Sequence, residues 1–149
     1  MSHSLTEIWI HAVWGTKDHI PLLKDGFKAE LIRHIHTKIE EMGCPLRIVN
    51  GPADHLHALF LLNIEKTLAD VLQMAKGESA HWVNQQQFLK TKFAWQTGYG
   101  GFSVSPTMVK KVEVYIRRQE EHHRKMTFQE EYERFMIMMG FPIGPGFGQ

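Results

Sequence analysis

The chain has 149 residues, of which 43% are hydrophobic and 22% charged. These values are typical of a globular protein and predict one domain with a substantial hydrophobic core. Its single cysteine, Cys44, excludes an intramolecular disulfide. No run approaches the roughly 20 apolar residues of a membrane span, and no signal-peptide pattern is present. We therefore expect a cytoplasmic protein with no membrane partner.

The net charge is only +1, because 17 lysines and arginines face 16 aspartates and glutamates. A strongly basic domain is the usual signature of nucleic-acid binding, so bulk charge does not suggest it here. Any such binding would depend on local basic clusters. These clusters are Lys90 with Lys92, Lys110 with Lys111, Arg117 with Arg118, and Arg124 with Lys125.

The first half of the chain predicts three strands and one helix. Residues 7–14 are rich in Ile, Val and Trp and predict a buried strand. Asp25 is the expected N-cap of a helix that ends at Gly43. A short strand over residues 46–49, a turn and a third strand over residues 55–62 follow. The apolar face of the helix would be Leu31, Ile35, Ile39 and Met42.

The second half predicts a fourth strand and three helices. Thr67 and Asp70 form a capping-box pattern that opens a helix to about Phe88. Residues 93–104 predict a strand with a loop or bulge. Ser105 followed by Pro106 favours a helix start, with the helix running to about Lys125.

A last short helix would follow Thr127 with Glu130 and carry Tyr132, Phe135 and Met136. The order of elements predicts an α+β fold with a mainly antiparallel sheet, helices on one side and a helical C-terminal appendage. We expect a single domain over residues 1–140 and a flexible Gly- and Pro-rich tail over residues 141–149.

The clearest chemical signal is the pair His55 and His57 at the head of the third strand. Side chains on a strand alternate between faces, so both imidazoles project the same way while Leu56 points into the opposite layer. Two imidazoles about 7 Å apart by strand rise can hold one divalent metal ion. An isolated H-x-H pattern is a weak signal, and a purely structural role for the pair is equally compatible with it.

A second signal lies on the predicted helix after Pro106. Lys111, Tyr115, Gln119 and His122 share one helical stripe beside the apolar stripe of Val109, Val112 and Ile116. Tyr115 would then sit at the edge of the buried face with its hydroxyl free, a position that a packing tyrosine also occupies. The amide oxygen of Gln119 would offer a third neutral ligand, and such a set suits Mn²⁺ or Mg²⁺. Together these residues indicate a metal-assisted tyrosine nuclease.

Several other side chains have both a functional and a structural interpretation. Trp95, Tyr99 and Phe102 could stack on unpaired bases, although core packing is the commoner use of such residues. His11 could neighbour the histidine pair, and Tyr132 is the rival nucleophile but lacks a glutamine four residues later. The candidate phosphate contacts are Lys76, Lys111, Arg117 and Arg118.

Five segments share their residues and order with a known family. They are residues 10–17 (IHAVWGTK), 54–58 (DHLHA), 76–79 (KGES), 93–100 (FAWQTGYG) and 112–119 (VEVYIRRQ). In these segments, over about residues 5–140, the chain resembles the single-tyrosine HUH transposases of bacterial insertion sequences, the IS200-like family. The H-x-H pattern alone is unspecific, whereas five blocks in order are specific.

The resemblance implies a ferredoxin-like antiparallel sheet with helices on one face and a C-terminal helix that carries the tyrosine. It implies that Tyr115 is the nucleophile and that His55, His57 and Gln119 hold Mg²⁺ or Mn²⁺. Members of this family cut single-stranded DNA at the ends of the element through a 5′-phosphotyrosine, leave a free 3′-OH, and recognise imperfect hairpins. They are homodimers in which the tyrosine of one chain can serve the site of the other.

Three alternatives remain open at this stage. A domesticated relative would bind hairpin DNA or RNA without cutting it, although a binder has no need of the complete set of site residues. A metal-dependent phosphoesterase that uses water would tolerate Tyr115→Phe. A sheet protein whose histidine pair is structural would show no metal-dependent thermal shift.

Overall fold

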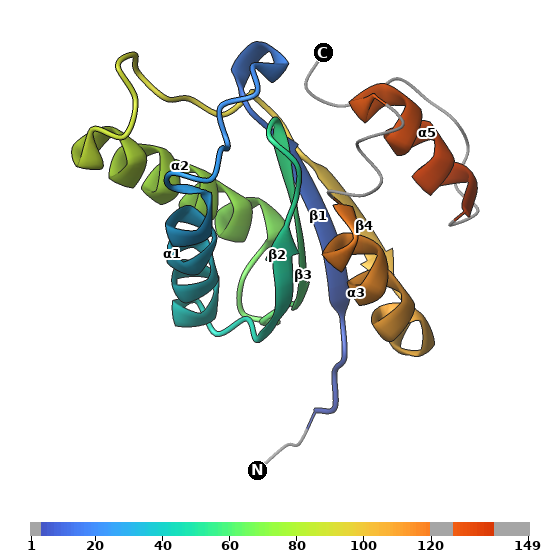
Figure 1. Cartoon of the computed structure of the whole chain (residues 1–149). Coiled ribbons are helices and arrows are strands. Elements are labelled where there is room, and N and C mark those ends of the chain that lie inside the picture. Colours follow the sequence, from blue (N-terminus) through green and yellow to red (C-terminus); the bar gives the residue numbers. More distant parts are fainter. Residues whose placement is uncertain (1–3, 120–126, 139–149) are drawn as a thin grey trace.

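The computed structural model describes residues 4–119 and 127–138 and contains a four-stranded antiparallel sheet (Figure 1). The strand order is β2-β3-β1-β4, with β1 paired to both β3 and β4. The chain order β1, α1, β2, β3, α2, β4 gives the α+β, ferredoxin-like arrangement that was expected. The bounds are β1 Trp9–Gly15, α1 Lys28–Glu41, β2 Leu46–Asn50, β3 His55–Leu61, α2 Leu68–Gln86 and β4 Gly100–Val104.

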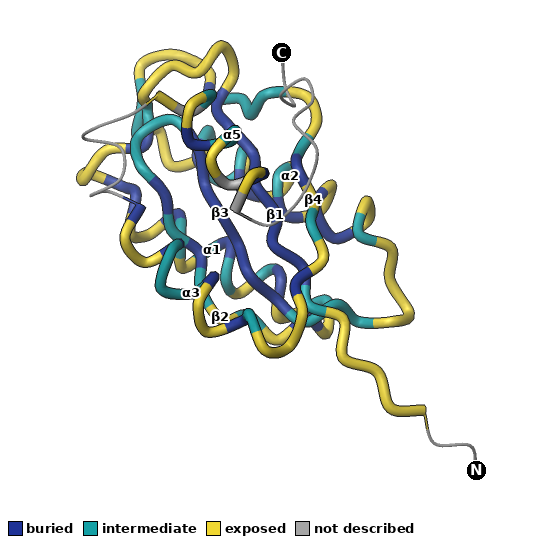
Figure 2. The backbone as a smooth tube through the Cα atoms, turned by 90° about the vertical axis from the view of Figure 1, so that its right-hand side faces the viewer, coloured by how far each residue is buried: buried dark blue, intermediate teal, exposed yellow. Residues whose placement is uncertain are grey.

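The main hydrophobic core lies between one face of the sheet and the helices α1 and α2 (Figure 1). β1 contributes Ile10, Ala12 and Trp14 to this core, and β3 contributes Leu56, Ala58 and Phe60. Burial of one large apolar side chain stabilises a fold by about 1.5–3 kcal/mol, so this layer supplies most of the apolar driving force. Figure 2 shows the central strands as the most continuously buried part of the backbone. The helical residues of this core include Leu31, Ile35, Ile39, Val71, Leu72 and Ala75.

A smaller core lies on the opposite face, beneath helix α3 (Val109–Arg117). Leu59 of β3 and Val104 of β4 meet Val109, Val112 and Ile116 of α3 there. Helix α5 (Phe128–Met138) lies on the same side of the sheet, beyond α3 (Figure 1). The expected placement of helices on one face therefore holds for α1 and α2, whereas α3 and α5 cover the other face.

The start of α1 corrects one sequence-based prediction. Asp25 is not the N-cap, because the helix begins at Lys28 after Phe27. The amides of Phe27 and Lys28 both donate to the Lys24 carbonyl, and a backbone turn thus replaces the side-chain cap. The Phe27 ring is buried and stacks on Phe88, with centroids 5.1 Å apart. Tertiary packing of this ring decides where the helix begins.

The caps of α2 and α5 agree with the sequence. The Thr67 hydroxyl accepts the Asp70 amide at 3.0 Å, and the Thr127 hydroxyl accepts the Glu130 amide at 3.2 Å. The strand predicted over residues 93–104 is shorter, since β4 covers only Gly100–Val104. Residues before it form loops with one isolated bridge between Thr16 and Trp95.

The helix that carries Tyr115 begins later than predicted and is interrupted at Arg118. A 3₁₀ turn over Pro106–Met108 precedes α3, α3 ends at Arg117, and Gln119 is helical again after a turn at Arg118, while the rest of the predicted stretch to Lys125 lies outside the described residues. The side chain of Asn50 donates to the carbonyls of Ile116 and Arg117 at the end of α3, where helix carbonyls need such partners. Because α5 follows, α3 is not the last helix. His122, Arg124, Lys125 and the predicted tail lie outside the described residues.

Within residues 4–119 and 127–138, no helix combines the length and the apolar character that crossing a membrane requires.

Candidate active site

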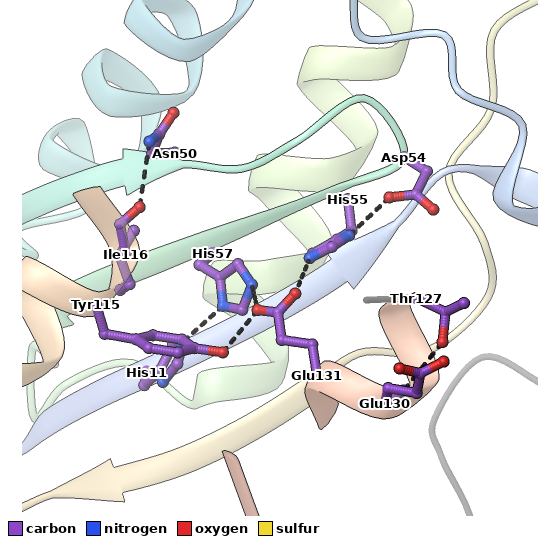
Figure 3. Close-up of polar contacts among 10 residues, drawn as sticks. All are labelled: His11, Asn50, Asp54, His55, His57, Tyr115, Ile116, Thr127, Glu130 and Glu131. Carbon is purple, nitrogen blue, oxygen red and sulfur yellow. Dashed lines mark hydrogen bonds and ion pairs between the residues drawn. The ribbon is translucent and has the colours of Figure 1, made fainter. Parts of the chain in front are cut away.

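Strand β3 places the two histidines on the face of the sheet that α3 covers (Figure 3). His55 and His57 are 0% and 4% exposed, while Leu56 between them enters the main core on the opposite face. The prediction that side chains along this strand alternate between the two faces of the sheet is therefore confirmed. The turn before β3 approaches closely, since a Cβ at Gly51 would overlap the His55 carbonyl.

Each of the two imidazoles is oriented by a second group. His55 Nδ1 lies 2.8 Å from Asp54 Oδ1, and His57 Nδ1 lies 2.8 Å from His11 Nε2 (Figure 3). Both Nε2 atoms consequently face the space beneath α3 and α5. Such partners of the other ring nitrogen fix the orientation of metal-ligating histidines. His11, which sequence reasoning left open, is fully buried on β1 and belongs to the site.

A carboxylate from α5 completes the cluster. Glu131 Oε1 lies 3.1 Å from His57 Nε2, and Glu131 Oε2 lies 3.3 Å from His55 Nε2. The residue is 3% exposed. Sequence reasoning missed Glu131, because an acidic residue in the first turn of a helix is ordinary and favoured by the helix dipole. The only signal was the capped helix after Thr127, which predicts the helix and not its place.

Tyr115 points from α3 toward the same carboxylate (Figure 3). Its hydroxyl donates to Glu131 Oε1 at 2.7 Å, so the expectation of a free, outward hydroxyl is wrong. The ring lies edge-on to His57, with centroids 5.9 Å apart. Burial raises the pKa of the Tyr115 phenol, and the Glu131 carboxylate raises it further. The phenol is protonated in this arrangement and needs activation before it can act as a nucleophile.

Gln119 follows the end of α3 and is fully buried. Against the larger effects of burial and Glu131, the Gln119 side chain lowers the pKa of the Tyr115 phenol. Within the described part of the chain neither its amide oxygen nor its nitrogen has a hydrogen-bond partner. A buried amide left in this state is costly, and a ligand at the site would satisfy it.

The surroundings of His11 and His55 shift the pKa values of the two imidazoles in opposite directions. Burial lowers the pKa of His11 well below its usual value, and the neighbouring His57 lowers it further. Burial also disfavours the charged form of His55, but hydrogen bonds with Asp54 and Glu131 outweigh it and raise the pKa of His55. A neutral His11 thus supports His57, and a carboxylate holds His55.

Comparison with protein-family models gives a match over residues 4–119 to the family described as "Transposase IS200 like". The chain belongs to this family. A comparison with curated proteins gives no match. The resemblance stated from the five sequence segments is confirmed by the family model, which covers the histidine pair and Tyr115.

Two solved structures show the fold of the transposase family. A protein of Deinococcus radiodurans R1 assigned as a transposase is 21% identical, with a TM-score of 0.65, and the match covers 80% of this chain and 96% of that one. A REP-associated tyrosine transposase bound to a REP hairpin is 15% identical, with a TM-score of 0.60, and the match covers 100% of this chain and 94% of that one. At these sequence identities the similarity shows the fold alone.

The residues of the transposase site fit a divalent metal ion. Ligand atoms of His55, His57 and Glu131 all lie within 4.8 Å of one another. The imidazole nitrogens of His57 and His55 lie 3.1 and 3.3 Å from the Glu131 oxygens, which is close enough for the three residues to share one ion. Two imidazoles and a carboxylate suit Mn²⁺ or Mg²⁺ among other divalent ions.

The four predicted phosphate contacts are not part of this cluster; they are exposed or have other partners. Lys76 donates to the carbonyls of Gln96 and Gly98, at 2.9 and 2.6 Å, and thereby anchors the loop before β4. Arg117 pairs with Glu113, whereas Lys111 and Arg118 are exposed on or next to α3. Trp95 packs against Trp14 and donates to Ser79, as the core-packing interpretation expected.

Two aromatic side chains border the site instead. The ring of Phe102 lies 6.4 Å from that of His11, and the ring of Tyr132 lies 6.5 Å from that of Phe102. The hydroxyl that reaches the histidine cluster is that of Tyr115, which favours Tyr115 over Tyr132 as the reactive tyrosine.

Proposed function

We propose that this member of the IS200-like transposase family cleaves and rejoins single-stranded DNA through a covalent phosphotyrosine at Tyr115. One observation carries the proposal. The Tyr115 hydroxyl and the two β3 histidines converge on a single buried carboxylate, at 2.7, 3.1 and 3.3 Å. A phenol used only for packing has no need of a convergent set of metal-binding side chains.

His55 and His57 would hold a divalent metal ion, with Gln119 as the third ligand predicted from the sequence. Mg²⁺ or Mn²⁺ bound there would neutralise charge on a scissile phosphate and align it with the nucleophile. The buried, unpartnered amide of Gln119 supports this assignment. Asp54 and His11 keep the imidazoles oriented through their Nδ1 atoms.

The chain's own residues account for the covalent step. The Tyr115 oxygen forms a bond to phosphorus, the bond from phosphorus to the 3′ oxygen breaks, and the strand leaves with a 3′-OH that takes its proton from water. The phenolic proton must leave as the oxygen attacks, and Glu131 Oε1 is the acceptor already in place at 2.7 Å. The ester bond is kept in the 5′-phosphotyrosine, so a 3′-OH can later reverse the reaction without a nucleotide cofactor.

The DNA substrate would be single-stranded with hairpin ends. The REP-associated neighbour, which has the same fold, is bound to a REP hairpin, and this supports a hairpin as the recognised feature. Lys111, Arg117 and Arg118 are exposed on or next to the tyrosine helix, where they could contact phosphates. Lys76 would contribute only if a phosphate shared its ammonium with the two loop carbonyls. A DNA substrate also agrees with a cytoplasmic location.

The test is a denaturing gel with labelled single-stranded DNA that contains candidate element ends. Wild type and Tyr115→Phe are incubated with and without Mn²⁺, and Tyr132→Phe is the matched control on α5. We expect a metal-dependent protein–DNA adduct that disappears in Tyr115→Phe and persists in Tyr132→Phe. Cleavage that survives in Tyr115→Phe would instead indicate a phosphoesterase that uses water. Hairpin binding without any cleavage would indicate a domesticated binder.

A second part of the proposal is that two chains form a homodimer in which Tyr115 can serve the partner's metal site. Excision needs two cuts held together, and each chain supplies one such tyrosine. Mixed dimers of His55→Ala and Tyr115→Phe chains test this arrangement. Recovered adduct formation in the mixture indicates trans sites, and its absence indicates that each tyrosine acts within its own chain.

A further inference from the structure

The environment of Glu131 differs from that of an ordinary buried glutamate. Its two carboxylate oxygens face the Nε2 atoms of His55 and His57, and one of them also accepts the Tyr115 hydroxyl (Figure 3). The side chain is 3% exposed. A carboxylate taken out of water is costly unless a positive charge or several hydrogen bonds compensate it.

The orientation of the histidines decides what can lie between these atoms. Asp54 faces Nδ1 of His55 and His11 faces Nδ1 of His57, so the Nε2 atoms are the ones directed at Glu131. Two imidazole nitrogens and a carboxylate that converge in this way are three groups that one divalent cation can bind together.

The carboxylate belongs to an element that is remote in sequence. Glu131 is on α5, whereas the histidines are on β3, 74 and 76 positions earlier in the chain (131 − 57 and 131 − 55). Two of the contacts between α5 and the rest of the fold are those of Glu131 with the histidines and of the Tyr132 ring with Phe102 on β4. A ligand on α5 would therefore connect the C-terminal helix to the central strands.

We infer that Glu131 is a protein ligand of the divalent metal, so that metal binding and the docking of α5 over Tyr115 stabilise each other. This inference rests on the proposed metal-assisted function and adds a ligand that the sequence did not predict. Linkage makes the effect reciprocal: whatever α5 docking adds to metal affinity, the metal adds to the stability of the docked helix.

The reciprocity also gives α5 a regulatory role at the site. With the ion bound, α5 is held against the strand that carries the histidines, and the Tyr115 hydroxyl stays hydrogen-bonded to a ligand of the same ion. Without the metal, Glu131 keeps only its contacts with the Tyr115 hydroxyl and the two histidines, and we expect α5 to open more often. Metal loading thus sets how firmly α5 covers the tyrosine.

The test measures binding of Mn²⁺ alone to the full chain, by the loss of the free-ion paramagnetic resonance signal. Glu131→Gln is nearly isosteric, and Glu131→Ala is a second variant. Glu130→Gln changes an exposed neighbour on the same helix and is the matched control. Gln119→Ala reports on the rival ligand, and circular dichroism confirms folding of each variant.

We expect both Glu131 variants to weaken Mn²⁺ binding at least about tenfold, since loss of outer partners of a ligand already costs 10–100-fold. Glu130→Gln should stay within about twofold of wild type. Amide hydrogen exchange provides the second readout. Mn²⁺ should slow exchange in Phe128–Met138 of wild type and have no such effect in Glu131→Gln.

The inference is overturned if Glu131→Gln binds Mn²⁺ as wild type does and Mn²⁺ leaves exchange in α5 unchanged. In that case Glu131 serves only as the hydrogen-bond partner of Tyr115, and the proposed function stands as long as wild type binds Mn²⁺ and forms the DNA adduct. A wild-type chain that binds no Mn²⁺ would overturn the metal-assisted function together with this inference.

Discussion

Alternate residues of strand β3 lie in two different environments, one on each face of the sheet. On the face covered by α1 and α2 it contributes Leu56, Ala58 and Phe60 to a large apolar core. On the other face it contributes His55 and His57 to the site and only Leu59 to the small core beneath α3. Both sets are almost completely buried, so exposure does not separate them. What separates them is whether burial of the side chain releases apolar surface or requires polar partners.

This contrast shows how the fold can remain stable although one face of its sheet buries polar groups. The large core supplies stabilisation that does not depend on the tyrosine helix. The site face buries histidines, a carboxylate and an amide, which are groups that contribute little to stability unless each has its partner. Substitutions on the first face should therefore change unfolding alone, whereas substitutions on the second should also change the chemistry at Tyr115.

The largest expected effect compares two identical substitutions, Ile35→Ala on α1 and Ile116→Ala on α3. Both side chains are 0% exposed and lie on opposite faces of the sheet. Each should lower the free energy of unfolding by about 2–5 kcal/mol, as measured by urea denaturation. Only Ile116→Ala should also reduce adduct formation under conditions where the protein is folded, because Ile116 is next to Tyr115. Equal adduct yields from the two variants would show that the faces are not functionally distinct.

A smaller effect compares two asparagines that each bind backbone groups. Asn50 donates to the carbonyls at the end of α3, and Asn84 pairs with both the amide and the carbonyl of Phe93 on the other side of the sheet. Loss of two such hydrogen bonds should cost about 1–3 kcal/mol of unfolding free energy in either Asn→Ala variant. Adduct formation should fall in Asn50→Ala only. A drop in Asn84→Ala of similar size would contradict the comparison.

The smallest effect concerns Glu113 of α3, which forms surface ion pairs with Arg47 of β2 and with Arg117 of its own helix. Although burial opposes it, hydrogen bonds from Arg117 and Arg47 hold the pKa of Glu113 below its usual value. A carboxylate whose pKa is lower in the folded chain stabilises the fold at pH values above its pKa in the unfolded chain, which is about 4.3 for glutamate. This stabilisation is lost as the pH falls through the lower pKa of the folded state. The arginines are 47% and 61% exposed, so solvent screens the pairs. Glu113→Gln should cost about 0.2–1 kcal/mol at neutral pH.

The loss of unfolding free energy caused by Glu113→Gln should shrink toward zero when urea denaturation is repeated at decreasing pH. Glu65→Gln, at an exposed loop position, is the control and should show a smaller dependence on pH. A cost in Glu113→Gln that stays constant down to strongly acidic pH would mean that the charge of Glu113 is not what stabilises α3.

Local pattern predicted much of this fold because the relevant forces act between near neighbours in sequence. Alternation along β3 placed the histidine pair on one face, and helical spacing placed Val109, Val112 and Ile116 in a core. Hydroxyl caps at Thr67 and Thr127 marked the starts of α2 and α5. Asp25 failed as a cap for the opposite reason, since the packing of Phe27 on Phe88 is a contact between distant segments.

Long-range contacts also decided the parts of the site that the sequence did not reveal. Asn50 on β2 donates to the carbonyls of Ile116 and Arg117 and so ties the end of the tyrosine helix to the sheet. Glu131 is one of the acidic residues that are common in the first turn of a helix, and only the position of α5 places it at the centre of the cluster. His11 became part of the site through pairing of β1 with β3, which brings its ring against His57.

The sequence by itself determined the order of the strands and main helices, the face on which His55 and His57 project, the helix that carries Tyr115 and the family to which the chain belongs. These features follow from periods of two and of about 3.6 residues and from short motifs, all of which are local. The tertiary structure alone decided that Tyr115, both histidines and Glu131 meet at one buried point. Such a meeting depends on how β3, α3 and α5 pack, and no local pattern encodes the distance between segments separated by dozens of residues.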